Sequence, residues 1–178
     1  MSSSLFVSVY RVSLVKDETV SFTPDSLNNS QQASRLIRDL IFTHGQPDRE
    51  QFVVAFLNAK NIITGLNIVS VGSLTSAVVS PREVLKPAIL SNSAAIILAH
   101  NHPSNNLEPS KEDIFITEQI IRAAYAVGIA VHEHLIISME HQEYFSFADQ
   151  GIIQSLSAEV RLNPIPSSIQ SAKQTPAQ

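Results

Sequence analysis

Apolar residues recur along the chain with two different spacings, which predict a mixture of strands and helices. Short continuous apolar runs, such as those at residues 52–57 and 94–99, are typical of strands covered on both faces. Residues 58–61 predict a hairpin turn that brings the next strand back beside the first of these. Strands are expected over residues 5–14, 52–57, 62–71, 94–99, 129–137 and 144–147.

Three other stretches carry helix signals, either apolar residues three and four positions apart or a capping sequence at the start. These helices are expected over residues 30–43, from residue 80 onward, and over residues 110–127. Ser30 and Ser80 can cap the first two, and Gly128 can end the third. Pro87 lies inside the second helix and removes a hydrogen bond, so we expect a kink or a later start than Ser80 indicates.

The predicted strands and helices do not alternate strictly, and two of the strands form a hairpin. This pattern indicates the α/β or α+β class, with a mixed sheet flanked by helices. Of the 178 residues, 44% are hydrophobic and 16% are charged, which is enough for the core of one domain. Beyond about Asn163 the chain consists mainly of Ser, Gln, Pro and Ala, and this tail is predicted to be disordered.

Composition and charge narrow the possible functions. The chain has no cysteine, which excludes disulfides, thiolate metal sites and a cysteine nucleophile, so any metal must be held by histidine and carboxylate. The net charge is −4 and the pI about 5.8, without the basic cluster typical of nucleic-acid-binding proteins. No run approaches the ~20 apolar residues of a membrane span, and no signal-peptide pattern is visible, so a cytoplasmic protein is expected.

The strongest chemical signal follows the second buried strand, where His100-x-His102 leads through a polar loop to Ser110 and Asp113. Residues two apart at the end of a strand project to the same side, so both imidazoles can reach one ion. A carboxylate at a helix start can supply a third ligand, as in catalytic zinc sites that leave the fourth position to water. Sites in α/β proteins are often built at the ends of buried strands.

Each part of this pattern also has a simpler interpretation. A pair of histidines two apart is a weak metal signal by itself. Ser110-x-x-Asp113 matches an ordinary capping box, which is the better explanation for these two residues alone. The combination favours a metal site, because two histidines follow a wholly apolar strand and a proline-containing loop then delivers the carboxylate.

His-x-His, seven residues and then Ser-x-x-Asp resembles the signature of the JAB/MPN (JAMM-motif) zinc metallopeptidases, and the chain matches it without a gap. Neighbouring phrases resemble the bacterial RadC-like branch of that family. These phrases are residues 80–84, 96–104, 109–114 and 144–147. The resemblance extends over residues 50–151, and it implies a mixed sheet between helices in a deaminase-like layout.

The resemblance also implies a chemistry for this chain. His100, His102 and Asp113 would bind one zinc ion per chain. Glu50, just before the first core strand, would be the general base, and Ser110 would help to stabilise the oxyanion. The implied reaction is hydrolysis of a peptide, isopeptide or other amide bond by metal-activated water.

The resemblance divides the chain into three parts. Residues 50–151 form a JAB/MPN catalytic domain, residues 1–49 add a strand and a helix packed on its core, and residues 152–178 form an extension. RadC-like proteins are commonly labelled as DNA-repair factors, and longer members carry an N-terminal helix-hairpin-helix module. Residues 1–49 show no such module, so strong DNA binding is not expected.

Two positions depart from the family pattern without touching a proposed ligand. Asn105 stands where the family usually has glycine, and asparagine tolerates positive φ better than most residues, so the loop is expected to keep its shape. Glu133 stands where the family often has aspartate, which preserves the charge on a longer side chain.

The remaining histidines have simpler explanations than catalysis. His132 and His134 are two apart on a predicted strand, and a partly exposed strand face explains them better than a second metal site. His44 lies near a helix C-terminus, where a cation is favoured, and His141 lies in an acidic turn. The chain has no Gly-x-Ser-x-Gly elbow, and the lack of Cys-x-x-Cys excludes a zinc deaminase.

The sequence therefore predicts a zinc-dependent hydrolase whose substrate is a peptide or protein with an amide or isopeptide bond. Two rival functions are a non-catalytic scaffold domain of the same fold and a DNA-repair accessory that acts by binding DNA. No ligand is missing, which argues against the first, and the acidic balance argues against the second. If Glu50 is not the base, Glu83 and Glu112 are the next candidates. The sequence does not specify the oligomeric state.

Overall fold

A five-stranded sheet forms the centre of the fold. The structure is a computed structural model, and it describes residues 11–17, 19, 29–72 and 79–163. The strands are β1 (Gln51–Leu57), β2 (Ile63–Val71), β3 (Ala95–Asn101), β4 (Ala130–Ile137) and β5 (Tyr144–Ser146). They lie in the order β2-β1-β3-β4-β5. Only β3 and β4 run parallel, and the other neighbouring strands are antiparallel, so the predicted mixed sheet is confirmed.

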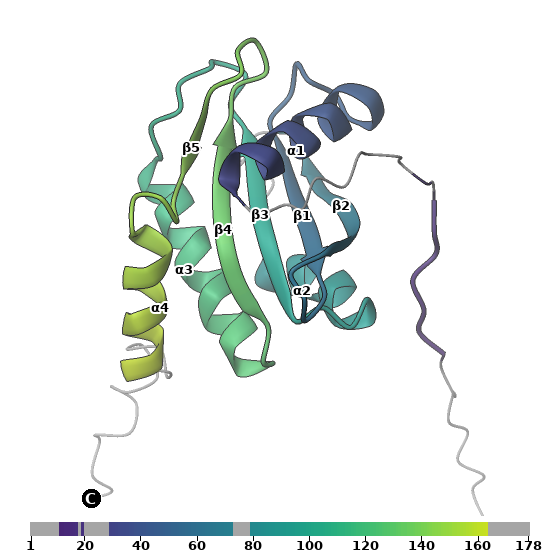
Figure 1. The fold of residues 1–178 in the computed structure, drawn as a ribbon, viewed down its shortest axis with the longest axis vertical. Helices are drawn as coiled ribbons and strands as arrows, with labels where there is room; N and C mark the ends of the chain where they lie inside the picture. Colours follow the sequence, from purple (N-terminus) through teal and green to yellow (C-terminus); the bar gives the residue numbers. More distant parts are fainter. Residues whose placement is uncertain (1–10, 18, 20–28, 73–78, 164–178) are drawn as a thin grey trace, which may run out of the picture.

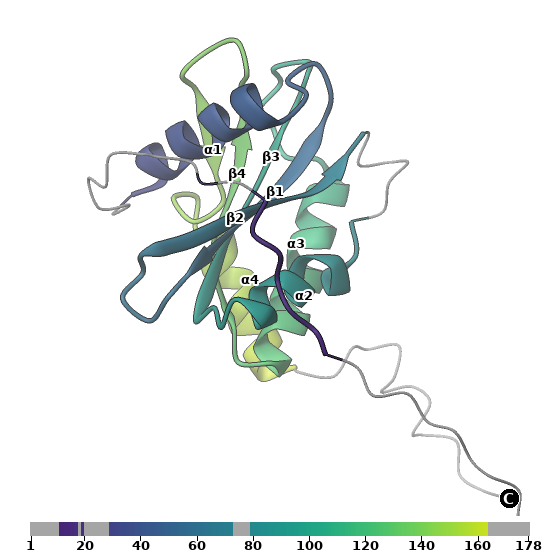
Figure 2. The same cartoon turned by 90° about the vertical axis from the view of Figure 1, so that its right-hand side faces the viewer.

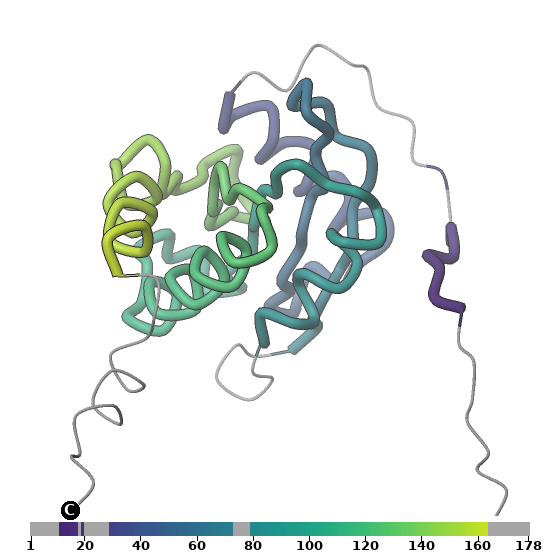
Figure 3. The backbone as a smooth tube through the Cα atoms, turned by 90° about the horizontal axis from the view of Figure 1, so that it is seen from below, coloured from purple at the N-terminus to yellow at the C-terminus, as the bar shows by residue number. Residues whose placement is uncertain are grey.

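Helices cover both faces of this sheet (Figure 1, Figure 2). They are α1 (Ser30–His44), α2 (Pro81–Leu90), α3 (Lys111–Ala126) and α4 (Ile152–Leu162). Of these helices, α1 packs on one face, while α2, α3 and α4 pack on the other. The tube in Figure 3 shows the same separation of α1 from α3 and α4 when the molecule is seen from below. The flanked sheet expected from the sequence is therefore present.

Burial on both faces explains why β1 and β3 are continuous apolar runs. All seven residues of each strand are buried. In β3, Ile96 and Leu98 belong to the core under α2, α3 and α4, whereas Ile97 and Ala99 belong to the core under α1. Because side chains alternate along a strand, the next residue on the α3 side is His100. The strand thus delivers a histidine into the layer between the sheet and α3.

The structure defines the starts of the first two helices, and one of them differs from the sequence-based expectation. Asn29, rather than Ser30, is the N-cap of α1, and its side-chain oxygen accepts a hydrogen bond of 2.9 Å from a backbone N–H. Both residue types cap equally well, so the sequence alone does not separate them. The second helix, α2, begins at Pro81 directly after Ser80 and continues through Pro87. The alternative of a later start is therefore wrong.

Helix α4 was not predicted from the sequence, which was expected to form no helix after residue 151. The N-cap of α4 is Gly151, which has φ of 73° and provides no side-chain hydrogen bond, so the usual start signal is absent. Ile153 and Val160, seven residues apart, are the buried residues of the helix and pack into the core shared with α3. The apolar spacing was therefore the only local signal.

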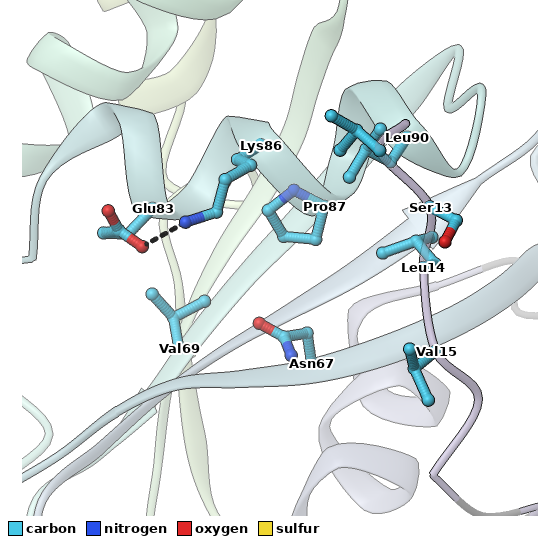
Figure 4. A pocket seen from close by; sticks show the side chains of 10 residues that line it. Ser13, Leu14, Val15, Asn67, Val69, Glu83, Lys86, Pro87 and Leu90 are labelled. Atoms are coloured by element: carbon cyan, nitrogen blue, oxygen red, sulfur yellow. Dashed lines mark hydrogen bonds and ion pairs between the residues drawn. The ribbon is translucent and has the colours of Figure 1, made fainter. Parts of the chain in front are cut away.

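The N-terminal strand expected over residues 5–14 falls mostly outside the described residues. Residues 11–17 are described and form no strand, so this part of the prediction is wrong. With β2 and α2 they line a hollow of about 340 Å³ (Figure 4). Val12 and Val15 remain 69% and 88% exposed, which shows that the segment gains little burial there. The tail expected to be disordered lies, after Asn163, outside the described residues.

None of the helices in the described part of the chain is both long and apolar enough to cross a membrane.

Candidate metal centre

The two histidines of the His-x-His motif meet at the end of β3. His100 is fully buried within the strand, and His102 follows it at the surface of a pocket. Their Nε2 atoms lie 2.9 Å apart. The structure therefore brings both imidazoles to one point, as their spacing predicts.

Asp113 reaches the same point from the first turn of α3. Its Oδ1 lies 3.2 Å from Nε2 of His100, and its Oδ2 lies 3.8 Å from Nε2 of His102. The residue is 1% exposed, although it stands at a helix start. Two imidazoles and one carboxylate thus converge in a largely buried place.

Ser110 is the N-cap of α3 and forms a complete capping box with Asp113. The backbone N–H of Asp113 donates to Ser110 Oγ at 3.1 Å, while the hydroxyl and the backbone N–H of Ser110 both donate to Asp113 Oδ2 at 2.7 Å. The simpler interpretation of this pair is therefore correct. It does not compete with the contact to the histidines, because the capping bonds hold Oδ2 and leave Oδ1 directed at His100.

The protonation state of Asp113 follows from these contacts. Burial alone would raise the pKa of this carboxyl, but the hydrogen bond and charge of His100, together with hydrogen bonds from Ser110, hold it well below its usual range. Asp113 is therefore a carboxylate at neutral pH, and it needs a positive charge beside it. A metal cation would supply that charge.

A backbone contact fixes the ring orientation of His102. Its Nδ1 lies 2.5 Å from the backbone oxygen of Asn106. A carbonyl oxygen only accepts hydrogen bonds, so Nδ1 carries the proton and the Nε2 lone pair is directed at His100. This is the tautomer that a metal-binding histidine needs.

Glu50 completes the group from the other side of the pocket. It precedes β1, and its carboxylate, His100 and His102 each offer a ligand atom within 4.8 Å of the others. This distance suits a ligand and also suits a base that acts beside the ligands. The geometry alone therefore admits both roles for Glu50.

Asn101, between the two histidines, holds the backbone around Glu50. Its side chain points to the other sheet face, where Oδ1 accepts from the Gln51 N–H and the amide donates to the Arg49 carbonyl, both at 2.9 Å. The Glu50 carbonyl in turn accepts a 2.8 Å bond from the Gly72 N–H. No role was predicted for Asn101 from the sequence, although its place between two histidines on a strand already implied a side chain on the opposite side.

We expect Asn101→Ala to lower the free energy of unfolding by about 1–3 kcal/mol, because the buried N–H of Gln51 and the partly buried carbonyl of Arg49 lose their partner. Asn67→Ala is the matched control, since Asn67 is an exposed asparagine on β2, and it should change stability by less than about 0.5 kcal/mol. Urea unfolding of the metal-stripped proteins measures both values. Equal losses for the two variants would show that the Asn101 bonds do not stabilise the fold.

The pocket in front of these residues has a volume of about 360 Å³. Its lining includes Glu50, His102 and Asp113, and two further carboxylates, Glu108 and Glu112. All the carboxylates of the lining are therefore unopposed by lysine or arginine, and its other residues are His102 and four uncharged residues. Such a lining suits a cation and repels phosphate.

The loop that follows His102 adopts the conformation expected from its sequence. Asn105 has φ of 56°, the left-handed region that glycine normally occupies at this position of the family pattern, so the expected tolerance is confirmed. The side chain adds a contact that glycine lacks, since its Oδ1 accepts from the Ser138 hydroxyl at 2.9 Å and the Met139 N–H at 3.2 Å. The loop is thereby fixed to the end of β4.

The two histidines of β4 do not form a second metal site. His132 is exposed and lies 3.1 Å from Asn61, whereas His134 is fully buried beside His100. The pairing of β3 and β4 shifts at this point and leaves His132 without a register partner. The prediction of a partly exposed strand face is thus correct for His132 and wrong for His134. His44 lies in the last turn of α1, as predicted.

Comparison with known proteins assigns the family. The model of the family described as "RadC-like JAB domain" matches residues 27–152. The chain belongs to this family. The sequence-based recognition is thereby confirmed, and the mixed sheet flanked by helices fits a JAB domain.

Relatives of this RadC-like JAB domain occur in distant microorganisms. The UPF0758 protein of Salinibacter ruber is 48% identical over 118 residues, which cover 66% of this chain and 47% of the relative. Those of Rubrobacter xylanophilus and Moorella thermoacetica are 45% and 52% identical, covering 60% and 51% of this chain and 45% and 39% of the relatives. The chain thus spans a little under half the length of these relatives.

The residues of the JAB domain fit a zinc ion. Imidazole nitrogens and a carboxylate oxygen are ordinary zinc ligands, and the chain has no thiolate to offer instead. Separations of 2.9, 3.2 and 3.8 Å among the atoms of His100, His102 and Asp113 are those of donors that can share one small cation. The donor set is therefore consistent with the zinc that the family resemblance implies.

Proposed function

We propose that this domain is a zinc-dependent hydrolase of peptide or isopeptide bonds. The observation that supports the proposal is the convergence of His100, His102 and Asp113 with Glu50 at one pocket. The first three would hold the metal. When bound, zinc supplies Lewis acidity, which polarises a carbonyl and lowers the pKa of water from 15.7 toward about 7.

Side chains of the protein would then accept and donate the protons of the reaction. Glu50 lies half-buried beside the two histidines and lines the pocket, so its carboxylate can take a proton from water there. The same oxygen can later return the proton to the leaving amine. Asn101 would keep this carboxylate in place through the backbone on either side of it.

Ser110 has a double task in this proposal. In the structure its single hydroxyl proton is donated to Asp113, so it orients a metal ligand. To stabilise an oxyanion, the hydroxyl would have to rotate toward the pocket, where Ser110 is exposed. The backbone N–H of Ser110 would still hold Asp113 after that rotation.

The acidic pocket supports an amide substrate over a nucleic acid. Glu108 and Glu112 line it together with Glu50, and a phosphate backbone would meet these carboxylates without a cationic side chain among the lining residues. A polypeptide carries no such charge along its backbone. We therefore propose peptides and proteins as the substrate class.

A cleavage screen tests the proposal directly. Zinc-loaded protein and a chelated control are incubated with a peptide library and with lysine-linked isopeptides, and the products are identified by mass spectrometry. Products that appear only with zinc and disappear in the Glu50→Gln variant would support the hydrolase. The same cleavage in the chelated sample, or no cleavage of either substrate class, would favour the scaffold domain.

We expect this chain to bind duplex DNA weakly and with a shallow dependence on salt. Each phosphate neutralised by the protein contributes about −0.9 to the slope of log K against log salt, and an acidic chain can neutralise few. Fluorescence anisotropy with a labelled duplex at several salt concentrations measures both quantities. Tight binding with a steep slope would instead support the DNA-repair accessory.

A further inference from the structure

His134 is a buried histidine that the proposed reaction does not use. It lies on β4, opposite Leu98 of β3, and is completely inaccessible to solvent. Its Nε2 lies 2.8 Å from Nδ1 of His100, and its ring lies against those of Phe52 and Phe147 at centroid distances of 5.4 and 4.7 Å. A polar ring in such an apolar place needs partners for both nitrogens.

Thr117 determines the direction of the hydrogen bonds of His134. Thr117 Oγ1 lies 2.5 Å from the backbone oxygen of Asp113. Two oxygens this close must share a proton, and the carbonyl has none, so the threonine hydroxyl donates. Thr117 Oγ1 then accepts from His134 Nδ1, which is 2.6 Å away. The proton of His134 is therefore on Nδ1.

The other nitrogen of His134 is an acceptor. The ring is fully buried against two phenylalanine rings, and its Nδ1 proton is donated to a neutral hydroxyl, so a charge on it would be costly. The ring is therefore neutral, and Nε2 carries a lone pair. The hydrogen bond between the two histidines then requires a proton on Nδ1 of His100. In neutral His100 this leaves a lone pair on Nε2, the atom that faces His102 and Asp113.

We propose that His134 is a positioning residue of the metal centre, which fixes the tautomer and ring orientation of His100 by accepting its Nδ1 proton. The inference rests on the proposed function of this site as a metal centre. His134 cannot itself bind the same ion, because it faces Nδ1 of His100 while the other ligands face Nε2.

The same chain of bonds connects two ligands on different elements. It begins at His100 on β3, passes through His134 on β4, and ends through Thr117 at the backbone of Asp113 on α3. The distance between strand and helix at the metal centre is thereby set by buried hydrogen bonds. Partners of this kind keep histidine ligands aligned in metal sites, and their loss typically weakens metal binding 10–100-fold.

The test compares two substitutions of His134 by zinc affinity. His134→Leu fills the space without a hydrogen bond and should raise the zinc dissociation constant about 10–100-fold. His134→Gln can accept from His100 and donate to Thr117 through one amide, so its dissociation constant should stay within about threefold of the parent value. Competition with a chromophoric chelator measures the affinities, and the visible spectrum of the cobalt-loaded proteins reports the ligand geometry.

Glu133→Gln is the matched control for a general loss of stability. Glu133 is also buried on β4, but its carboxylate accepts from the hydroxyls of Ser30 and Ser146 and from the backbone N–H groups of Ala148 and His134, not from an imidazole ring. This variant should lose stability and keep the parent's zinc affinity and cobalt spectrum. If His134→Leu does not fold, Thr117→Val should still weaken zinc binding, because it removes the acceptor of His134 together with the hydrogen bond to the Asp113 carbonyl.

The role of His134 and the existence of the metal centre can be tested separately. A parent protein that binds zinc, with His134→Leu or Thr117→Val binding it equally tightly, would overturn the role of His134 and leave the metal centre standing. Equal weakening by Glu133→Gln would also overturn it, because stability alone would then explain the effect. A parent protein that binds no zinc would remove the proposed function and the inference together.

Discussion

Glu50→Gln should keep zinc binding and lower turnover by about 10²–10⁴-fold, the usual contribution of a positioned base. Glutamine has nearly the same shape and can still donate and accept hydrogen bonds, but it cannot take a proton near neutral pH. Because the backbone on either side of Glu50 is held by Asn101, the variant should melt within a few degrees of the parent. Turnover of a peptide from the cleavage screen, zinc content and thermal melting measure the three effects.

The result also decides between the two roles that the geometry admits for Glu50. A variant that loses its zinc would make Glu50 a ligand, which its distance from both histidines allows. A variant with parental turnover would move the base to Glu112, which lines the same pocket. Glu83, the other candidate named from the sequence, lies instead in the hollow beside β2, 3.0 Å from Lys86 (Figure 4).

The sheet could be predicted because its central strands have strong and local signals. Strands β1 and β3 are buried along their whole length, so apart from Gln51, His100 and Asn101 their sequences are continuous apolar runs. The candidate site could be predicted as well, because a histidine pair lies at the end of β3. The next helix then begins with a capping serine and a carboxylate. Both patterns depend on residues close together in the sequence.

Other features depend on contacts that the local sequence does not contain. His134 is buried because Phe52 and Phe147, far apart in the sequence, enclose its ring, and because β4 shifts its register beside β3. Helix α4 begins at Ile152, after an N-cap glycine without a capping side chain, and it is held by packing against α3. Such tertiary contacts override weak local signals.

The double variant His100→Ala, His102→Ala should lose zinc entirely. Elemental analysis of protein purified without chelator should find about one zinc per parent chain and less than about 0.1 per variant chain, as expected of a single three-ligand site. The parent should also be stabilised by added zinc, by about 2.7 kcal/mol at a free concentration of 100 times the dissociation constant, and the variant should not respond. Thermal melting with and without zinc measures this second effect.

Two further variants test whether the loss of zinc is specific to the His-x-His motif. His132→Ala, His141→Ala removes two exposed histidines and should keep one zinc, because neither ring lies at the pocket. His102→Ala alone removes the partly exposed ligand and leaves the contact of His100 with Asp113, so zinc loss in this variant would not reflect a disrupted core. Zinc that persisted in the double variant would have to be bound without the His-x-His motif, and the assignment of the metal centre would then be wrong.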